Sequence, residues 1–267
     1  MRGVDRKTAV VSGGATIIGE AVVHAFARAG ANVVIADIDV EGGSRVADQF
    51  DDRVRFVATD LRDDASCEGC IASAVEAYGA LNLLVNLAAV YVDDGFDSSR
   101  QDWLESFNVN VVGGVMMLKA ARPHMQRAGG GAVVNFGSIS GKVAQTGRWL
   151  YPVSKAAILQ LTRNEAMDLA PDGIRVNSVS PGWTWSRVMA ELSGNDRAHT
   201  DAVGGAFHLF GRVADPEEIA RAVLFLCSEE ATFITGADLA VDGGYSAMGP
   251  ERAEPAIPLL AKEERPQ

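Results

Sequence analysis

Short apolar runs alternate with longer amphipathic segments along most of the chain. The apolar runs that have the length of a β-strand lie at 8–12, 32–37, 54–59, 81–86, 131–137, 175–180 and 238–241. Helical patterns fall between them, at 18–29, 65–78, 100–127, 151–170 and 216–227. This alternation is typical of consecutive βαβ units. We therefore expect one α/β domain, a doubly wound seven-stranded parallel sheet with helices on both faces.

Two segments depart from this rhythm. Residues 183–210 are long and mixed in pattern, which favours a mobile lid, with a poorly ordered insertion as the alternative. The last residues, 249–267, are rich in Pro, Glu, Arg and Lys. They predict a loose tail, or an arm over a neighbouring subunit. The domain itself is therefore expected to span 1–248.

Composition and charge exclude several classes of protein. The net charge of −11 repels nucleic-acid backbones and anionic lipid. No apolar run approaches the roughly 18 residues that a membrane span needs, and residues 1–7 do not lead into a signal-like apolar stretch. The chain has only 3 cysteines, in keeping with a reducing cytoplasm. We expect a cytoplasmic protein that acts on a small molecule.

A glycine-rich turn follows the first predicted strand and opens the first helix. It contains Ser12, Gly13 and Gly19, with Ile17 and Ile18 between them. Glycine lets the backbone turn tightly and lets a pyrophosphate approach the positive N-terminus of a helix. In this setting the turn predicts a Rossmann-type dinucleotide site, although such a segment can also be a plain turn.

Asp37 ends the second predicted strand, where a ribose-binding carboxylate is expected. Such a carboxylate accepts hydrogen bonds from ribose hydroxyls and repels a 2′-phosphate. No Lys or Arg occupies residues 14–16 or 38 to receive that phosphate. The pattern therefore favours NAD over NADP. The alternative is that Asp37 only forms a turn at the strand end.

Tyr151 and Lys155 stand four residues apart and so share one face of a predicted helix. At about 5 Å and an effective dielectric near 20, a lysine ammonium stabilises a phenolate by roughly 3 kcal/mol. We expect this attraction to lower the pKa of Tyr151 by about two units, toward that of a useful general base.

Together with Asn110 and Ser138, these motifs resemble the short-chain dehydrogenase/reductase family, over about residues 7–247. The resemblance implies that Tyr151 takes the proton of a substrate hydroxyl while hydride passes to a bound nicotinamide. It implies that Lys155 holds the nicotinamide ribose and that Ser138 positions the substrate oxygen. Asn110 is expected to hold a water between Lys155 and solvent.

The same resemblance implies further cofactor contacts. They are expected from Ser12, Gly13, Ile17, Ile18, Gly19, Asp37, Asp60, Leu61, Asn86, Ala88, Tyr151, Lys155, Pro181, Gly182, Thr184 and Ser186. The chain departs from the family pattern at two places. Ile17 replaces a glycine of the turn, and Leu87 replaces the second asparagine of an Asn-Asn-Ala-Gly motif. We expect Ile17 to point away from the pyrophosphate, and both changes to affect the affinity for the cofactor rather than its identity.

Three tryptophans lie close in sequence to the predicted site. Trp149, Trp183 and Trp185 are expected to line the mouth of the substrate pocket beside Ser138 and Tyr151. Such an apolar lining favours a flat or cyclic hydrophobic substrate. Core packing or a subunit contact is an equal alternative.

Other chemistry-bearing residues suggest less. Arg148 and Arg187 could anchor a carboxylate, although a solvated face is the simpler interpretation. Cys67 and Cys70 form a C-x-x-C inside a predicted helix, where neither zinc nor redox chemistry is expected. No metal site is expected.

These observations predict an enzyme that transfers hydride between NAD(H) and a secondary alcohol or ketone. The expected substrate is cyclic or aromatic, such as a dihydrodiol, a cyclic alcohol or a hydroxysteroid. The alternatives are a 3-oxoacyl reductase of lipid metabolism and a non-catalytic NAD-binding regulator. Helices 100–127 and 151–170 resemble those that the family uses to dimerise, so a homotetramer is expected.

Overall fold

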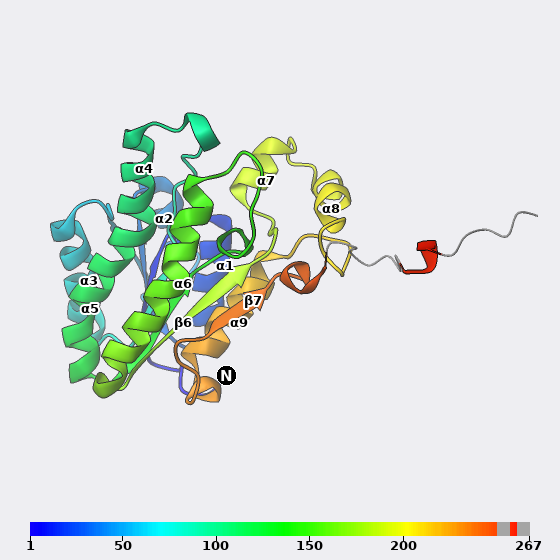
Figure 1. Ribbon diagram of the computed structural model, residues 1–267. Helices are drawn as coiled ribbons and strands as arrows, with labels where there is room; N and C mark the ends of the chain where they lie inside the picture. The colour runs from blue at the N-terminus through cyan, green and yellow to red at the C-terminus, as the bar shows by residue number, and fades with distance from the viewer. Residues whose placement is uncertain (250–256, 261–267) are drawn as a thin grey trace, which may run out of the picture.

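The computed structural model describes residues 1–249 and 257–260, and its centre is a parallel β-sheet (Figure 1). The strands are β1 Thr8–Ser12, β2 Asn32–Asp37, β3 Val54–Ala58, β4 Leu83–Asn86, β5 Gly131–Phe136, β6 Ile174–Pro181 and β7 Asp238–Val241. Every strand pair is parallel, and the order across the sheet is β3-β2-β1-β4-β5-β6-β7. The predicted doubly wound seven-stranded sheet is therefore confirmed.

Helices cover both faces of the sheet (Figure 1). They are α1 Ile17–Arg28, α2 Val40–Ala47, α3 Asp64–Tyr78, α4 Arg100–Phe107, α5 Gly114–Arg127, α6 Leu150–Leu169, α7 Arg187–Leu192, α8 Arg197–Gly205 and α9 Pro216–Cys227. The apolar cluster on one face packs α1, α2 and α9 against the strands, and the cluster on the other face packs α3, α5 and α6. Short 3-10 turns join these elements at Gly95–Asp97, Ile139–Gly141, Ala170–Asp172, Glu229–Ala231, Tyr245–Ala247 and Ile257–Leu260.

Local chemistry explains where most helices begin. Thr16 caps α1 by accepting a hydrogen bond from the Gly19 N–H at 3.1 Å. Ser99 and Asp102 form a reciprocal capping box at the start of α4. The long helix α6 differs, because its N-cap residue Trp149 makes no side-chain cap. Its first N–H groups need an acceptor from elsewhere in the chain.

The structure differs from the predicted helices in three places. The single helix expected at 100–127 is divided into α4, a π-helical turn Asn108–Gly113 and α5. Gly113 lies in that turn so close to Leu61 that an added Cβ would come within 2.7 Å of the Leu61 Cβ. Helix α2 was not predicted, because it buries only two of its residues. The segment 183–210 contains α7 and α8.

No helix in the described part of the chain is long and apolar enough to cross a bilayer. Most of the predicted tail, 249–267, lies outside the described residues. The division into a domain at 1–248 and a tail therefore stays a prediction.

Candidate active site

A cavity of about 500 Å³ opens at the carboxyl ends of the strands. It lies between the β1–α1 turn, the segments after β4 and β5, the start of α6, and the segment that contains α7. Many of the predicted site residues line it, namely Ile17, Ile18, Ser138, Tyr151, Lys155, Pro181, Gly182, Trp183, Thr184 and Ser186. This edge of a doubly wound sheet is where ligands of such folds bind.

Lys155 lies one helical turn after Tyr151 on α6, and both side chains are buried. The Lys155 Nζ donates a 2.7 Å hydrogen bond to the carbonyl oxygen of Phe136, at the end of β5. Its distance to the centre of the Tyr151 ring is 5.5 Å. Burial penalises the charged ammonium and lowers the pKa of Lys155 to about 8. The cation is thus held next to the phenol but titrates closer to neutrality than a free lysine.

The surroundings of Tyr151 correct one expectation from the sequence. Burial raises the pKa of the phenol well above its ordinary value, and Tyr91, stacked on the ring at 4.7 Å, raises it further. Arg148 and a hydrogen bond from Ser138 act in the opposite direction. The guanidinium of Arg148 lies over the ring, with its Cζ 4.9 Å from the ring centre. Lys155 alone therefore does not lower the pKa of Tyr151 as expected.

Asn110 lies in the π-helical turn beneath the cavity and does not line it. Its Oδ1 accepts from the Val90 N–H at 2.7 Å, and its Nδ2 donates to the Val90 carbonyl and to Ser154 Oγ at 3.1 and 3.2 Å. The side chain thereby ties the segment after β4 to helix α6. The structure places Asn110 as a support of the helix that carries Tyr151 and Lys155.

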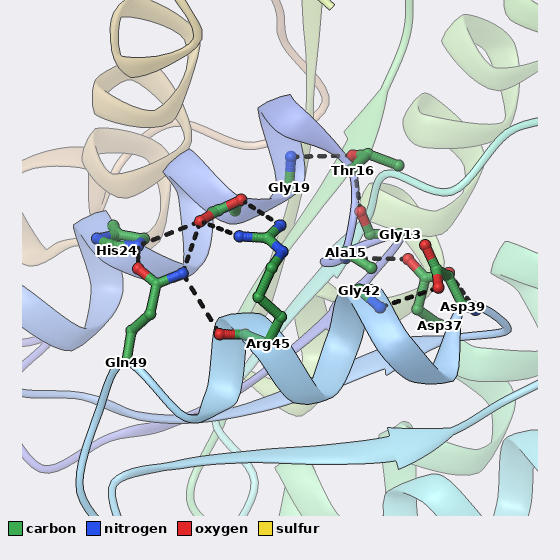
Figure 2. A network of polar contacts seen from close by, with 11 residues as sticks. Gly13, Ala15, Thr16, Gly19, His24, Asp37, Asp39, Gly42, Arg45 and Gln49 are labelled. Atoms are coloured by element: carbon green, nitrogen blue, oxygen red, sulfur yellow. Dashed lines mark hydrogen bonds and ion pairs between the residues drawn. The ribbon is translucent and has the colours of Figure 1, made fainter. Parts of the chain in front are cut away.

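The glycine-rich turn has a shape that fits a dinucleotide phosphate. Gly13 adopts a left-handed conformation with φ of 74°. An added Cβ on Gly19 would lie 2.1 Å from the Gly13 carbonyl oxygen. Figure 2 shows the Thr16 cap that holds the first turn of α1 against this loop. Glycine at both positions therefore lets the turn pack closely against the N-terminus of α1, where a phosphate would bind.

Asp37 reaches back from the end of β2 to the same turn (Figure 2). Its carboxylate accepts hydrogen bonds from the N–H groups of Ala15 and Asp39, at 3.0 and 3.1 Å. The nearby cation Arg45 is directed away from it and forms a bidentate pair with Glu20, at 3.2 and 2.8 Å. The residues at this end of the groove thus fit the adenosine ribose of a dinucleotide and offer no free cation to a 2′-phosphate.

Other predicted cofactor residues lie beneath or beside this groove. Ser12 is buried and accepts from the Leu87 and Ala88 N–H groups, which joins the ends of β1 and β4. The amide of Asn86 donates to Asn135 Oδ1 at 3.0 Å, while its own Oδ1 has no hydrogen-bond partner in the described residues. Of these five residues, only Leu87 lines the cavity.

Asp60 and Leu61 lie after β3, outside the cavity lining. Asp60 forms an ion pair with Arg62 at 2.8 Å, and Arg62 also reaches Glu105 on α4. Hydrogen bonds from the Arg62 side chain and backbone hold the pKa of the Asp60 carboxyl below its ordinary value. Leu61 is buried against the π-helical turn.

The two departures from the family pattern both face the cavity. Ile17, expected to point away from the pyrophosphate, is one of the lining residues at the start of α1. Leu87 also lines the cavity, and its side chain extends into the apolar core beneath. Their position is consistent with an effect on the affinity for the cofactor.

The three tryptophans lie in different surroundings, and only Trp183 lines the cavity. Trp183 lines the cavity and packs against Phe207 of the lid segment. Trp149 is half exposed and meets Phe96 edge-on, with ring centres 5.6 Å apart. Trp185 packs under the guanidinium of Arg197. Neither Trp149 nor Trp185 is part of the lining.

Asp93, which the sequence did not single out, supplies the missing cap of α6. Its Oδ1 accepts from the Trp149 and Gly95 N–H groups at 2.9 and 3.1 Å, and its Oδ2 accepts from the Tyr151 N–H at 3.0 Å. Burial raises the pKa of this carboxyl, but the backbone N–H groups outweigh it and hold the pKa below its ordinary value. A sign was present in the sequence, since no capping residue directly precedes this helix.

Other sequence features lie outside this chemistry. Cys67 and Cys70 are buried free thiols on α3, and burial raises the pKa of each to about 11, which makes them unreactive. His208 accepts from the Trp183 N–H and donates to the Gly204 carbonyl, so it fixes the lid segment internally. The described residues contain no cluster of His, Cys, Asp or Glu suited to a metal ion.

The chain was also compared with known proteins. The family described as "Enoyl-(Acyl carrier protein) reductase" matches residues 13–246. A cis-4-hydroxycyclohexanecarboxylate dehydrogenase from Sinomonas cyclohexanicum is 38% identical over 247 residues, which cover 91% of this chain and 97% of the relative.

Two further relatives have a similar extent of identity. A 2,5-dichloro-2,5-cyclohexadiene-1,4-diol dehydrogenase from Sphingobium indicum is 34% identical over 90% of this chain and 96% of its own length. A 3-alpha-(or 20-beta)-hydroxysteroid dehydrogenase from Mycobacterium tuberculosis is 35% identical over 90% of both chains.

Proposed function

Because the chain belongs to the short-chain dehydrogenase/reductase family, we propose that it is an NAD-dependent dehydrogenase of cyclic secondary alcohols. The family makes the protein an oxidoreductase. In the proposed direction the alcohol is oxidised to the ketone.

One observation carries the proposal: Ser138, Tyr151 and Lys155 line a single cavity together with the turn at the start of α1. An acid–base pair is useful to an alcohol dehydrogenase only if the dinucleotide groove opens beside it. The fold brings the two together at the carboxyl ends of β1, β5 and β6.

The residues divide the work as follows. A nicotinamide bound in the groove would supply the hydride chemistry, as the acceptor of hydride from the carbinol carbon. The phenolate form of Tyr151 takes the hydroxyl proton, and the electron pair of the O–H bond forms the carbonyl double bond as the hydride leaves the carbinol carbon. Ser138 holds the substrate oxygen, and its hydrogen bond to the phenol helps to lower the pKa of Tyr151. Lys155 would hold the ribose; the Phe136 carbonyl fixes its Nζ, and Asn110 supports the helix on which it lies.

The cyclic nature of the substrate is supported by the cavity wall and by the relatives. Apolar side chains of the lid segment, Trp183, Val188, Met189 and Leu192, line the same cavity as Tyr151. Three relatives act, by name, on cyclohexane, cyclohexadiene and steroid rings. Segment 183–210 closes over such a ring and excludes water from the hydride transfer.

The choice of NAD rests on Asp37 and Arg45. The carboxylate lies beside the turn where the adenosine ribose would bind, and the cation Arg45 on α2 is paired with Glu20. A 2′-phosphate would therefore meet negative charge without a compensating partner. A 3-oxoacyl reductase that receives an acidic carrier protein fits this chain less well, since its net charge is −11. A regulator without turnover would have no need of Tyr151.

We also propose that the protein is a cytoplasmic homotetramer. Leu104, Val112, Val153 and Met167 are large apolar side chains exposed along α4, the π-helical turn and α6. A second copy would bury this face. The free thiols of all three cysteines are in keeping with a reducing compartment. Light scattering that gives a tetramer mass supports the assembly, and a monomer mass contradicts it.

Formation of NADH, followed by absorbance, tests the function. The purified protein is offered NAD or NADP with a panel of cyclohexanols, hydroxycyclohexanecarboxylates, dihydrodiols and hydroxysteroids, and with linear alcohols as controls. The proposal expects turnover with NAD and a cyclic alcohol. Turnover confined to NADP, or to linear alcohols, would contradict it.

A further inference from the structure

Arg148 gives the cavity a positive charge that has no ion-pair partner among the residues the structure describes. Its Nη1 donates one long hydrogen bond, 3.4 Å, to Gln145 Oε1, which also accepts from Ser140 Oγ at 2.8 Å. An arginine guanidinium is a cation with five N–H donors in a planar fork. Arg148 is half-buried, so solvent compensates this charge only in part.

The other charged groups of the lining already have partners. Asp93 accepts hydrogen bonds from two backbone N–H groups at the start of α6 and from the Gly95 N–H in the segment after β4. Lys155 donates to the Phe136 carbonyl. Arg187 pairs with Glu191 at 2.8 Å. With Arg148 added, three cations and one anion line this cavity, in a chain whose net charge is −11.

The guanidinium of Arg148, unpaired in the described part of the chain, lies next to Tyr151, the proposed base. Its Cζ lies 4.9 Å from the centre of the Tyr151 ring, and both residues line the cavity, so the guanidinium is beside the phenol that would hold the alcohol. The planar fork of an arginine matches a carboxylate in two parallel hydrogen bonds. The apolar lid residues Val188, Met189 and Leu192 also line the cavity, and they offer a hydrocarbon ring an apolar surface to pack against.

We infer that Arg148 binds a carboxylate on the substrate, so that the enzyme acts on a compact cyclic hydroxy acid rather than on a neutral alcohol. The inference rests on the proposed function and narrows its substrate class. It assigns to Arg148 the selection of an anionic ring substrate and its orientation toward Tyr151.

Arg148 has a second effect that an experiment must distinguish from carboxylate binding. Arg148 also acts on the Tyr151 phenol, whose pKa it lowers. Loss of that effect would slow every alcohol alike, charged or neutral. Loss of a carboxylate partner slows only the acid. The informative quantity is therefore the ratio of kcat/KM for an acid to kcat/KM for its methyl ester, measured in the same variant.

The kinetic test uses both isomers of 4-hydroxycyclohexanecarboxylate, their methyl esters and cyclohexanol, with NAD. We expect the wild-type protein to prefer the acid, and Arg148→Gln to reduce the acid-to-ester ratio by about 10–100-fold, the range of a charge-assisted hydrogen bond. Arg148→Lys should restore part of the ratio. The matched control, Arg187→Gln, removes a cation that Glu191 already neutralises, and should leave the ratio within about 3-fold.

Two kinetic results would overturn the inference while leaving the function in place. In the first, Arg148→Gln slows acid and ester by the same factor. In the second, the wild-type protein oxidises cyclohexanol and the esters but not the acid. If none of these alcohols is oxidised, the proposed function fails instead.

A binding measurement tests, without turnover, whether Arg148 binds a carboxylate. Cyclohexanecarboxylate and its neutral amide, neither of which can be oxidised at a carbinol, are titrated into the NADH-loaded protein by calorimetry. We expect the acid to bind at least about 10-fold more tightly than the amide, and Arg148→Gln to abolish that difference. Equal binding of acid and amide to the wild-type protein would overturn the inference.

Discussion

The carboxylate of Asp93 accepts a hydrogen bond from the backbone N–H of Tyr151, 58 positions further along the chain, at 3.0 Å. A second contact of the same carboxylate, 2.9 Å from the Trp149 N–H, completes the cap of α6. The segment after β4 thus fixes the first turn of the helix on which the proposed base lies. Asp93 acts through the backbone, as a positioning residue for Tyr151.

Replacing Asp93 by Asn should therefore affect both stability and turnover. The amide has one acceptor oxygen and no charge, so part of the cap is lost, at a cost of about 1–2 kcal/mol. We expect Tm to fall by roughly 2–8 °C and kcat to fall about 10-fold, with a smaller change in KM. Asp94→Asn, at the exposed neighbouring position, is the control for both measurements. A variant at position 93 with wild-type kcat would show that the cap is merely structural.

Asp37 should decide between the two nicotinamide dinucleotides. In Asp37→Asn the oxygen that accepts from Ala15 is kept, but the negative charge facing the ribose is removed. We expect the ratio of kcat/KM for NAD to that for NADP to fall by about 10–100-fold. Asp39→Asn serves as control, since that side chain caps α2 through the Gly42 N–H. Equal ratios in wild type and Asp37→Asn would refute the role given to Asp37.

Glu165, on α6, should make stability depend on pH. Burial raises the pKa of this carboxyl to about 7, although a 2.7 Å hydrogen bond from Asn135 opposes the shift. Between the unfolded pKa, about 4.3, and pH 7 the folded protein holds the proton more tightly than the unfolded chain. The stabilisation is therefore complete below about pH 4.3 and is lost as the pH rises through 7.

The variant Glu165→Gln removes this titration while keeping an acceptor for Asn135. We expect its free energy of unfolding to match that of the wild type near pH 4 and to exceed it by about 1–3 kcal/mol at pH 8. Denaturant titrations at both pH values measure the difference, with Glu76→Gln, an exposed position on α3, as control. Parallel pH profiles of wild type and Glu165→Gln would contradict the argument.

The sequence predicted the sheet well because its strands are buried on both faces. Continuous apolar runs mark such strands, and all five residues of β1, for example, are buried. The helix α2 gave a weaker pattern, since only Gly43 and Val46 of its residues are buried. The π-helical turn was hidden inside an unbroken helical pattern, because Gly113 is selected there by a contact with Leu61 far away in the chain.

In the candidate site, too, the contacts between residues close in sequence were predictable, and those between residues far apart in sequence were not. Tyr151 and Lys155 are one helical turn apart, so their spacing alone predicted that they meet. The groups that set the pKa of Tyr151 include Tyr91, which comes from the segment after β4. Asp93 reaches the same helix from that segment. Such contacts depend on how the chain returns to the cavity, which spacing does not reveal.

The most direct test of the account compares Tyr151→Phe with the wild-type protein. Two quantities are measured, NADH formation from NAD and the best cyclic alcohol of the panel, and NADH binding by fluorescence titration. Because phenylalanine keeps the ring and loses only the proton-accepting oxygen, we predict a loss of kcat of at least about 100-fold with NADH affinity within about 3-fold. A variant that oxidises the alcohol at the wild-type rate would contradict the central claim that Tyr151 is the base.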